Sequence, residues 1–351
     1  MKFKQQTDSN EDIAFGTFSH IGKRSSQEDG ALVVPNFNEF LMKFQCYTGN
    51  HSPPLDYTIP RSFFAVLDGH AGSSCMKFVK RKIVSRVTSE YLLPPHCWAE
   101  SMRRAILSLE HEWTSIQKAS ENPDDSGTTI TVCVLEGDVL HCAWVGDSPC
   151  YINFEMSGVA TEVTSNHRPD NEIERNRIEA AGGMVYNKEF ATKPGCFLPK
   201  KIKIGPSRVF PGGLAVSRSI GDLKSKLPER GGREGTVIAD PGLKTLTIPK
   251  DARFIVVCTD GLSDNIDNDP GLLATCLKKG FYENYNSVKE GYFKGKTSKM
   301  NTVASLTAER AVYFGMNRCK KRHTQDNVTV VVLCMLQALN VKNLDNNNNN
   351  S

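Results

Sequence analysis

The chain has 351 residues, of which 39% are hydrophobic, and this length suits one large domain or two ordinary ones. Its 43 Lys and Arg residues against 39 Asp and Glu residues give a formal net charge of +4, which is close to balance. A dedicated DNA- or RNA-binding protein would usually carry a strong basic excess, so a nucleic-acid partner is not expected. No run of 18 apolar residues occurs, so the sequence predicts no membrane span.

The cysteines and the N-terminal residues indicate a reducing compartment. The chain has 11 cysteines, none in a Cys-x-x-Cys pair, and several such as Cys133, Cys142 and Cys258 lie inside apolar runs. Such positions are typical of reduced, buried thiols rather than of a disulfide framework. The N-terminus has no apolar stretch that would form a secretory signal. We therefore expect a cytoplasmic or nuclear protein, or one found in both places.

Strand-like apolar runs recur from one end of the chain to the other. In chain order they occupy residues 13–21, 30–34, 62–68, 128–136, 139–147, 149–155, 253–260 and 327–336. Short turn sequences separate the runs that begin at Thr128, Val139 and Pro149, which predicts an antiparallel meander.

Helical periodicity appears between these strands. In one segment Met102, Ile106, Leu109 and Trp113 recur on one face. Helices placed between meandering strands predict an α+β sandwich, in which sheets pack face to face and helices cover the outside. The predicted helices are residues 72–93, 98–119, 171–181 and 302–316.

We expect one folded domain over residues 11–337, because no long polar linker divides the chain. The proline-containing segments 36–60 and 188–213 are interpreted as loop insertions within that domain. Residues 1–10 are expected to be a flexible N-terminus, and residues 338–351, which include a run of asparagines, a disordered tail.

Acidic residues mark the ends of many of the predicted strands. Asp68 ends the run FFAVLD and is followed by Gly69 and His70. Taken alone, an Asp-Gly pair is an ordinary turn signal and an Asp is an ordinary helix cap, so each acid also has a purely structural interpretation. The other acids at or near strand ends are Glu28, Asp29, Asp147, Asp222, Asp260, Asp264 and Asp326.

Carboxylates that converged in one compact sheet protein would repel one another unless a cation lay between them. Carboxylate oxygens are the ligands that Mg²⁺ and Mn²⁺ prefer, and the absence of a His-Glu-x-x-His motif or of Cys and His at ligand spacing disfavours zinc. The sequence therefore predicts a carboxylate-rich metal site. Two such metals roughly 3.5–4 Å apart suit the activation of water against a phosphate ester.

A series of short motifs follows these acids along the chain in a fixed order. The motifs are RSSQEDG (24–30), VLDGHAGS (66–73), SGTTITVCVL (126–135), WVGDSP (144–149), NHRPDNEIERNRIEAAGG (166–183), GGLAVSRSIGD (212–222), ADPGL (239–243), CTDGLSDN (258–265) and QDNVTVVVL (325–333). With these motifs in this order, the chain resembles the PP2C (PPM) family of metal-dependent protein serine/threonine phosphatases. The resemblance runs from about residue 14 to residue 335.

The resemblance implies a four-layer α/β/β/α sandwich, in which two antiparallel sheets are flanked by helices. It also implies hydrolysis of phosphoserine and phosphothreonine in phosphoprotein substrates, by in-line attack of a water that bridges two metals. Domains of this family are usually self-contained, so we expect a monomer with no membrane partner.

Family roles carry over to individual positions of this sequence. Asp68 would bridge two Mg²⁺ or Mn²⁺ ions, and the carbonyl of Gly69 would add an oxygen. His70 would be the general acid that protonates the leaving alkoxide, and Arg24 would hold the substrate phosphate in its planar fork. The other metal positions would be Glu28, Asp29, Asp260 and Asp326, while Asp147 and Asp264 match acids of a third, weaker metal site.

Some positions depart from the family pattern. Pro149, Asn166 and Ser263 stand where Arg, Asp and a bulky aromatic residue are usual. None of these changes removes a metal acid, so what they leave open is the fine positioning of the site. The alternative function is a catalytically inactive PP2C-like scaffold or binding module. The complete set of acids, together with Arg24, favours the enzyme over that alternative. The near-neutral charge and the order of the motifs disfavour another two-metal hydrolase, such as a phosphodiesterase or a nuclease.

Overall fold

The computed structural model describes residues 13–49, 53–154, 160–191, 201–287, 298–319 and 326–339. The expected flexible N-terminus at residues 1–10 and residues 340–351 of the expected tail lie outside this description. Leu339 is fully buried in the core, so the folded part of the chain extends slightly past the predicted boundary at residue 337.

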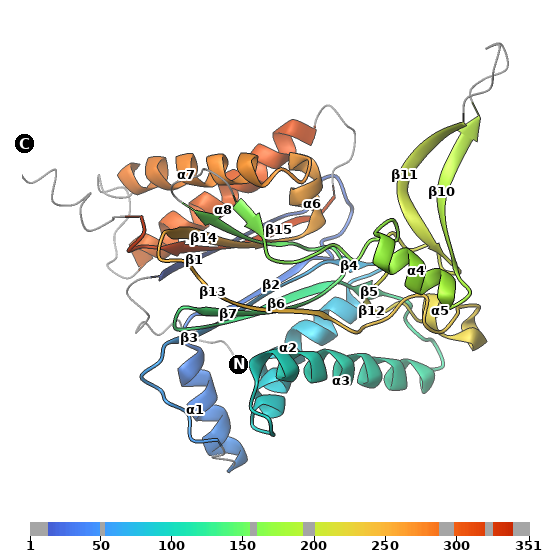
Figure 1. The fold of residues 1–351 in the computed structure, drawn as a ribbon, viewed down its shortest axis with the longest axis horizontal. Coiled ribbons are helices and arrows are strands. Elements are labelled where there is room, and N and C mark those ends of the chain that lie inside the picture. Colours follow the sequence, from blue (N-terminus) through green and yellow to red (C-terminus); the bar gives the residue numbers. More distant parts are fainter. Residues whose placement is uncertain are drawn as a thin grey trace, which may run out of the picture.

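Two antiparallel five-stranded sheets pack face to face, and helices cover both outer faces (Figure 1). The upper sheet consists, in order, of β1 (Ile13–His20), β15 (Val328–Met335), β14 (Ala252–Cys258), β8 (Cys150–Phe154) and β9 (Ala160–Glu162). The lower sheet consists of β13 (Gly242–Thr247), β7 (Val139–Val145), β6 (Ile130–Glu136), β3 (Arg61–Leu67) and β2 (Gly30–Val34). The predicted α/β/β/α sandwich is confirmed.

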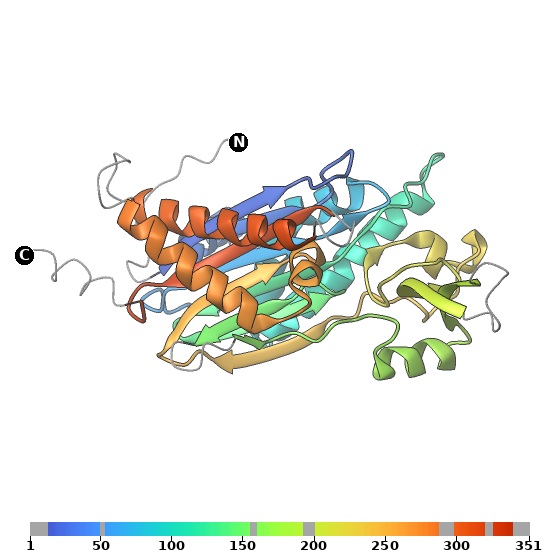
Figure 2. The ribbon, with the colours of Figure 1, turned by 90° about the horizontal axis from the view of Figure 1, so that it is seen from above.

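Helices α7 (Pro270–Ser287) and α8 (Ser298–Cys319) lie across the upper sheet, as Figure 2 shows from above. Helices α2 (Ser74–Tyr91) and α3 (Trp98–Lys118) cover the lower sheet (Figure 1). Contact between α8 and β1 is so close that a Cβ atom at Gly16 would overlap the backbone of Ala304. A side chain at that position would therefore push the helix off the sheet.

Strand β3 shows why the run RSFFAVL contains so few polar residues. All of its residues are buried, because each face of the strand meets a different core. Phe63, Ala65 and Leu67 pack toward the helices of the lower layer. Phe64 and Val66 alternate with them and pack between the two sheets.

The interpretation of residues 36–60 as a loop is wrong for its first half, which forms helix α1 (Phe37–Thr48). Asn36 caps the helix by accepting a hydrogen bond from the backbone N–H of Glu39, and Gly49 ends it with φ +69°. Phe37 and Leu41, one helical turn apart, are fully buried against β3 and the lower helices.

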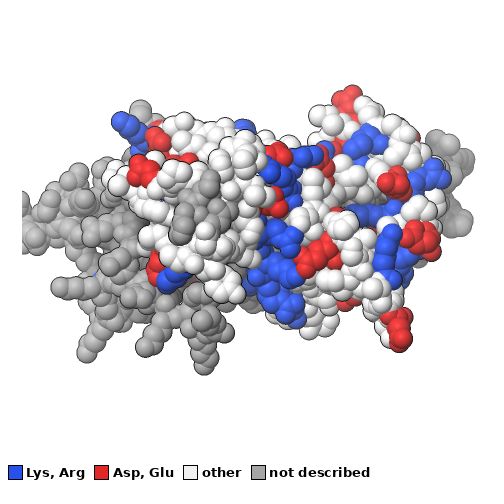
Figure 3. Space-filling view, turned by 90° about the horizontal axis from the view of Figure 1, so that it is seen from below, with Lys and Arg blue, Asp and Glu red and all other residues white. Residues whose placement is uncertain are grey.

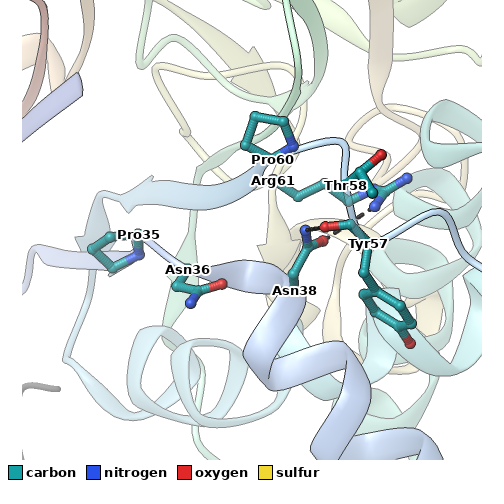
Figure 4. A pocket seen from close by; sticks show the side chains of 7 residues that line it. All are labelled: Pro35, Asn36, Asn38, Tyr57, Thr58, Pro60 and Arg61. Atoms are coloured by element: carbon teal, nitrogen blue, oxygen red, sulfur yellow. Dashed lines mark hydrogen bonds between the residues drawn. The ribbon is translucent and has the colours of Figure 1, made fainter. Parts of the chain in front are cut away.

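Polar contacts hold the second half of that segment in place (Figure 4). The Asn38 side-chain amide donates to the carbonyl oxygens of Tyr57 at 3.1 Å and Ile59 at 2.8 Å. Arg61 donates to the Asn38 Oδ1 at 3.1 Å. The small hollow that Figure 4 shows is lined by these residues and their neighbours, and none of the acids predicted for the metal site contributes to it.

The interpretation of residues 188–213 as a loop is also corrected, because most of the segment lies in an antiparallel hairpin. Its strands are β10 (Met184–Ala191) and β11 (Lys201–Phe210), and they extend away from the sandwich in Figure 1. Helix α4 (Glu172–Ala180) contacts β10 near the base of the hairpin. Prolines suggested a loop here, but Pro206 lies at an unpaired position of β11 and Pro211 directly follows that strand, while Pro194 and Pro199 lie outside the described residues.

The four predicted helices are confirmed as α2, α3, α4 and α8, with ends that shift by a few residues. Helix α7 and strand β13 were not predicted. Short elements complete the fold, and most of them lie near the ends of the large strands. They are β4 (Gly69–His70), β5 (Gly127–Thr128), β12 (Ile220–Gly221), α5 (Leu223–Lys226), η1 (Pro228–Arg230), α6 (Asp260–Ser263) and η2 (Asp264–Ile266).

The face covered by α2 and α3 carries charges of both signs (Figure 3). Lys82 and Arg86 of α2 both pair with Glu112 of α3, and Arg104 pairs with Glu90. These ion pairs link the two helices across their exposed sides. None of the helices in the described part of the chain combines the length and apolarity that crossing a bilayer requires.

Candidate metal centre

Acids from both sheets meet at one end of the sandwich. Asp68 follows β3 and Asp29 precedes β2 in the lower sheet, whereas Asp260 follows β14 and Asp326 precedes β15 in the upper sheet. Asp147 follows β7. Face-to-face packing of the sheets brings these strand ends together, close enough for the acids to raise one another's pKa.

The pKa values of these acids are shifted in one direction, which disfavours their charged forms. Burial raises the pKa of Asp68 well above its ordinary value, and the negative charges of Asp260 and Asp29 raise it further. Burial likewise raises the pKa of Asp260, with Asp147 adding to the effect. Each of these carboxylates is therefore unfavourable in its charged form unless a cation joins it.

Asp29 has a carboxylate oxygen without a hydrogen-bond donor. Its Oδ2 accepts from the hydroxyl of Thr259 at 3.1 Å, but its buried Oδ1 has no partner among the described residues. Burial raises the pKa of Asp29 to about 7. A buried oxygen of this kind costs free energy unless a proton or a cation satisfies it.

The residues present fit a hard divalent cation. The ligand atoms that converge are carboxylate oxygens, the carboxylates repel one another, and Oδ1 of Asp29 has no hydrogen-bond partner among the described residues. Mg²⁺ and Mn²⁺ prefer such oxygen donors and would remove the repulsion. Asp68 lies at the electrostatic centre, since Asp29, Asp147, Asp260 and Asp326 all raise its pKa.

Glu28 and Gly69 lie beside this cluster and contact each other through their backbones. The N–H of Gly69 donates to the carbonyl oxygen of Glu28 at 3.2 Å, and a Cβ at Gly69 would overlap that oxygen. The Glu28 side chain accepts from the backbone N–H of Gly72 at 3.2 Å and from the Ser26 hydroxyl at 2.9 Å. Glycine is therefore required at residue 69 for the chain to pass this close.

His70 pairs with Asp222. The Nε2 of His70 lies 2.9 Å and 2.8 Å from the two carboxylate oxygens of Asp222, which is nearly fully buried. Burial opposes the charged imidazolium, but Asp222 outweighs it and raises the pKa of His70. Gly127 leaves room for the pair, because a Cβ there would overlap both side chains.

Asp222 was noted in the sequence as an acid after an apolar stretch but was given no role. Its partner His70 lies 152 residues earlier in the chain, so the motif alone could not pair them. Asp222 has φ +57°, a conformation that Asp adopts more readily than most residues. The sequence signal was the pair Gly221-Asp222, two residue types that adopt positive φ more readily than most, as both do here.

Arg24 lies at the exposed edge of the cluster and forms an ion pair with Asp326. Asn327, next to Asp326, organises the loop that carries Arg24. Its Nδ2 donates to the carbonyl oxygens of Ile21 at 2.8 Å and Ser26 at 3.0 Å, and its Oδ1 accepts from the N–H of Glu28 at 2.8 Å. The sequence prediction missed this function of Asn327.

Arg168 was also missed. Its Nε donates to Asp147 at 2.7 Å and its Nη2 donates to Asp264 at 2.9 Å, with Asp260 at 3.8 Å. Burial raises the pKa of Asp147, and Arg168 opposes that effect. Arg168 lies inside the recognised motif NHRPDNE, but nothing in the sequence showed which acids it would reach.

A second group of potential metal ligands lies between the sheets. The sulfurs of Cys133, Cys142 and Cys150 are all within 4.8 Å of one another, and the three side chains are fully buried. Apolar side chains of the inter-sheet core surround them, so several thiolates there would have no compensating charge. We interpret the group as core packing, in agreement with the prediction of reduced, buried thiols.

The fold and the acid cluster place the protein in a class: two-sheet sandwich proteins with a candidate metal centre at the strand ends. The family described as Protein phosphatase 2C matches residues 20–272 of the chain. The chain belongs to the protein phosphatase 2C family, and the resemblance inferred from the motifs is confirmed.

Relatives agree with this assignment. The chain is 27% identical to Protein phosphatase 1E of Mus musculus over 334 residues, which cover 94% of this chain and 36% of that protein. It is 27% identical to Protein phosphatase 2C homolog 2 of Schizosaccharomyces pombe, over 72% of this chain and 58% of that protein. The chain thus spans about a third of the length of its mammalian relatives.

A solved structure of serine-threonine phosphatase 2C from Toxoplasma gondii has the same fold. It superimposes with a TM-score of 0.65 and covers 93% of this chain and 96% of that one, at 19% identity. At this level of identity the similarity establishes the fold alone.

Proposed function

We propose that the chain is a metal-dependent protein phosphatase that hydrolyses phosphoserine and phosphothreonine in proteins. The observation that carries the proposal is the convergence of buried, mutually repelling acids around Asp68, beside an arginine and a histidine. Membership of the protein phosphatase 2C family supports it. That family is generally metal-dependent and acts on phosphoproteins.

Asp68 would bridge two Mg²⁺ or Mn²⁺ ions, with the carbonyl of Gly69 beside it. Glu28, Asp29, Asp260 and Asp326 would supply the remaining oxygens, directly or through water. When bound, these ions supply Lewis acidity and a more acidic water for attack on phosphorus. The partnerless Oδ1 of Asp29 supports this assignment of the inner acids.

Arg24 would bind the phosphate of the substrate. Its side chain is 59% exposed, so a phosphate at the edge of the cluster can reach it from solvent. The ion pair with Asp326 orients the guanidinium at one edge and leaves other N–H groups for two parallel hydrogen bonds to phosphate oxygens.

His70 would donate the proton that the serine or threonine alkoxide needs as it leaves. The contact with Asp222 uses Nε2, so Nδ1 is the nitrogen that would carry the donated proton. Asp222 favours the charged imidazolium and fixes the orientation of the ring. Protonation of the leaving oxygen matters because an alkoxide is a poor leaving group.

A cysteine-dependent mechanism is disfavoured although Cys75 and Arg81 have the Cys-x5-Arg spacing. Cys75 is fully buried on α2, and its thiol lies 3.4 Å from the carbonyl oxygen of Ile220. Burial raises the pKa of this thiol well above its ordinary value. A buried, protonated thiol is not a nucleophile.

Release of phosphate from a phosphothreonine peptide tests the proposal. The assay compares Mn²⁺, Mg²⁺ and EDTA for the wild type, for Asp260→Asn and for the exposed control Asp138→Asn. We expect turnover that requires metal, collapses in Asp260→Asn and persists in the control. A folded wild type without turnover under either metal would overturn the proposal and favour the inactive scaffold.

A further inference from the structure

Two acids at the edge of the cluster, Asp147 and Asp264, already have a positively charged partner within the protein, Arg168. Arg168 donates to Asp147 at 2.7 Å through Nε and to Asp264 at 2.9 Å through Nη2. The same Nη2 lies 3.8 Å from Asp260, which is one of the acids assigned to the two metals. A single guanidinium therefore spans the edge of the cluster, whereas no such contact reaches the partnerless oxygen of Asp29.

The backbone holds Arg168 in this position. The N–H of His167 donates to the carbonyl oxygen of Gly146 at 3.0 Å, and the Nδ1 of His167 accepts from the N–H of Gly146 at 3.2 Å. The carbonyl oxygen of His167 accepts from the N–H of Ser217 at 2.9 Å. The residue before Arg168 is thus tied directly to the turn that carries Asp147.

A guanidinium and a divalent cation would compete for this position. The guanidinium already binds Oδ2 of Asp147 and Oδ1 of Asp264, and its positive charge would repel a divalent ion held by the same two carboxylates. The guanidinium cannot be removed by deprotonation, because arginine stays charged at every pH at which the protein is folded. The Asp147 side chain is only 5% exposed, so the compensation of its charge comes from within the protein, and Arg168 supplies it.

We propose that Arg168 is a tethered cation that takes the place of a third divalent ion at Asp147 and Asp264. The proposal rests on the proposed function, in which the inner acids around Asp68 hold two divalent ions. It departs from the expectation that Asp147 and Asp264 bind a weak third ion. Such an ion binds only when the Arg168 side chain leaves the two acids.

Counting bound Mn²⁺ tests this without measuring turnover. Free Mn²⁺ is measured by electron paramagnetic resonance while the metal is titrated into wild type, Arg168→Gln and Arg168→Lys. Arg175→Gln is the matched control, since Arg175 lies on neighbouring α4 and pairs with Glu179, away from the cluster. We expect about two ions in the wild type and the control, and about one more in Arg168→Gln. Arg168→Lys keeps the positive charge and should bind as the wild type does.

A wild type that binds a third ion as tightly as Arg168→Gln would overturn the proposal. So would an Arg168→Gln protein with an unchanged count. If Arg168→Gln does not fold, the wild-type count decides alone: saturation at about two ions supports the proposal, and a third ion of similar affinity overturns it.

The phosphatase proposal fails separately, through the turnover assay. Loss of turnover with an intact difference in the Mn²⁺ count would leave the role of Arg168 standing. The absence of Mn²⁺ binding in every variant would overturn both proposals.

Discussion

Two groups of buried acids in this protein have opposite electrostatics. Glu174 on α4 accepts from Arg177 at 2.9 Å, from Arg218 at 3.1 Å and from the Ser217 hydroxyl at 2.6 Å. Burial raises the pKa of Glu174, but these hydrogen bonds outweigh it and lower the pKa to about 2. Asp29, which is also buried, has a pKa raised to about 7 and an oxygen with no donor.

The difference shows how the chain uses its cations. Arginines pair with Glu174, which joins α4 to Ser217 and Arg218, and with Asp147 at the edge of the cluster. Asp29 instead accepts from the Thr259 hydroxyl, and the charges that shift the pKa of Asp68 are those of other acids. A carboxylate group whose charge is balanced by the protein stabilises the fold, whereas one whose charge is left unbalanced can bind a cation from solution.

Replacement of the central acid should have the largest effect. Asp68→Asn should lower phosphatase activity by about 10³-fold, because it removes the carboxylate that would bridge the metals. Metal-free Asp68→Asn should unfold at no lower denaturant concentration than the wild type, since the lost charge was repelled by its neighbours. Assays of turnover and of denaturant unfolding check both points. If Asp68→Asn lost stability but kept its turnover, Asp68 would belong with the acids that stabilise the fold and not with those that bind metal.

The opposite pattern is expected at Glu174. Glu174→Ala should lower the free energy of unfolding by about 3 kcal/mol, because it leaves Arg177 and Arg218 without their shared carboxylate. Urea unfolding measures the loss, with the exposed Glu172→Ala on the same helix as the control. An unfolding free energy equal to that of the control would show that the Glu174 network is not structural.

Asp222 tests whether a buried acid can act through its partner alone. Asp222→Asn should lower kcat on a phosphothreonine peptide by about 10- to 100-fold, because His70 loses the carboxylate that orients and charges it. An aryl phosphate, whose phenolate leaves without a proton, should be hydrolysed almost normally. Equal losses on both substrates would point to a general structural defect instead.

The last prediction concerns pH. Glu174 has a folded-state pKa of about 2 against an ordinary value of 4.5, so it stabilises the fold fully above pH 4.5. The stability difference between wild type and Glu174→Gln should therefore be constant above that pH. It should shrink as the pH falls from 4.5 toward 2, which denaturant unfolding at a series of pH values would show. A difference that grows on acidification would contradict the assigned pKa.

The sequence predicted the layers and the acids because both depend on local pattern. Strand β3 ends at Leu67 and Asp68 follows, so the acid had to lie at a sheet end wherever the strand was placed. The two insertions were misjudged because prolines were weighed above periodicity. Phe37 and Leu41 already had the spacing of a buried helical face.

Contacts between side chains that are far apart in the chain could not be predicted from the sequence. Whether Arg168 reaches Asp147 or solvent depends on the turn at Gly146 and on the backbone bond from Ser217 to His167. The pairing of His70 with Asp222 depends likewise on the room left by Gly127. These contacts are set by tertiary packing, so motifs named the residues without revealing what they touch.

The position of β15 has a consequence for synthesis of the protein. It lies between β1 and β14, and Thr329 of β15 bonds to Ser19 of β1, 310 residues earlier. At 5–20 residues per second, a ribosome needs roughly 15 to 60 s to make that interval. Until then β14 has an open edge that other chains can pair with. Asp326 and Asn327 emerge with this last strand, so a nascent chain acquires its acid cluster only when its upper sheet can close.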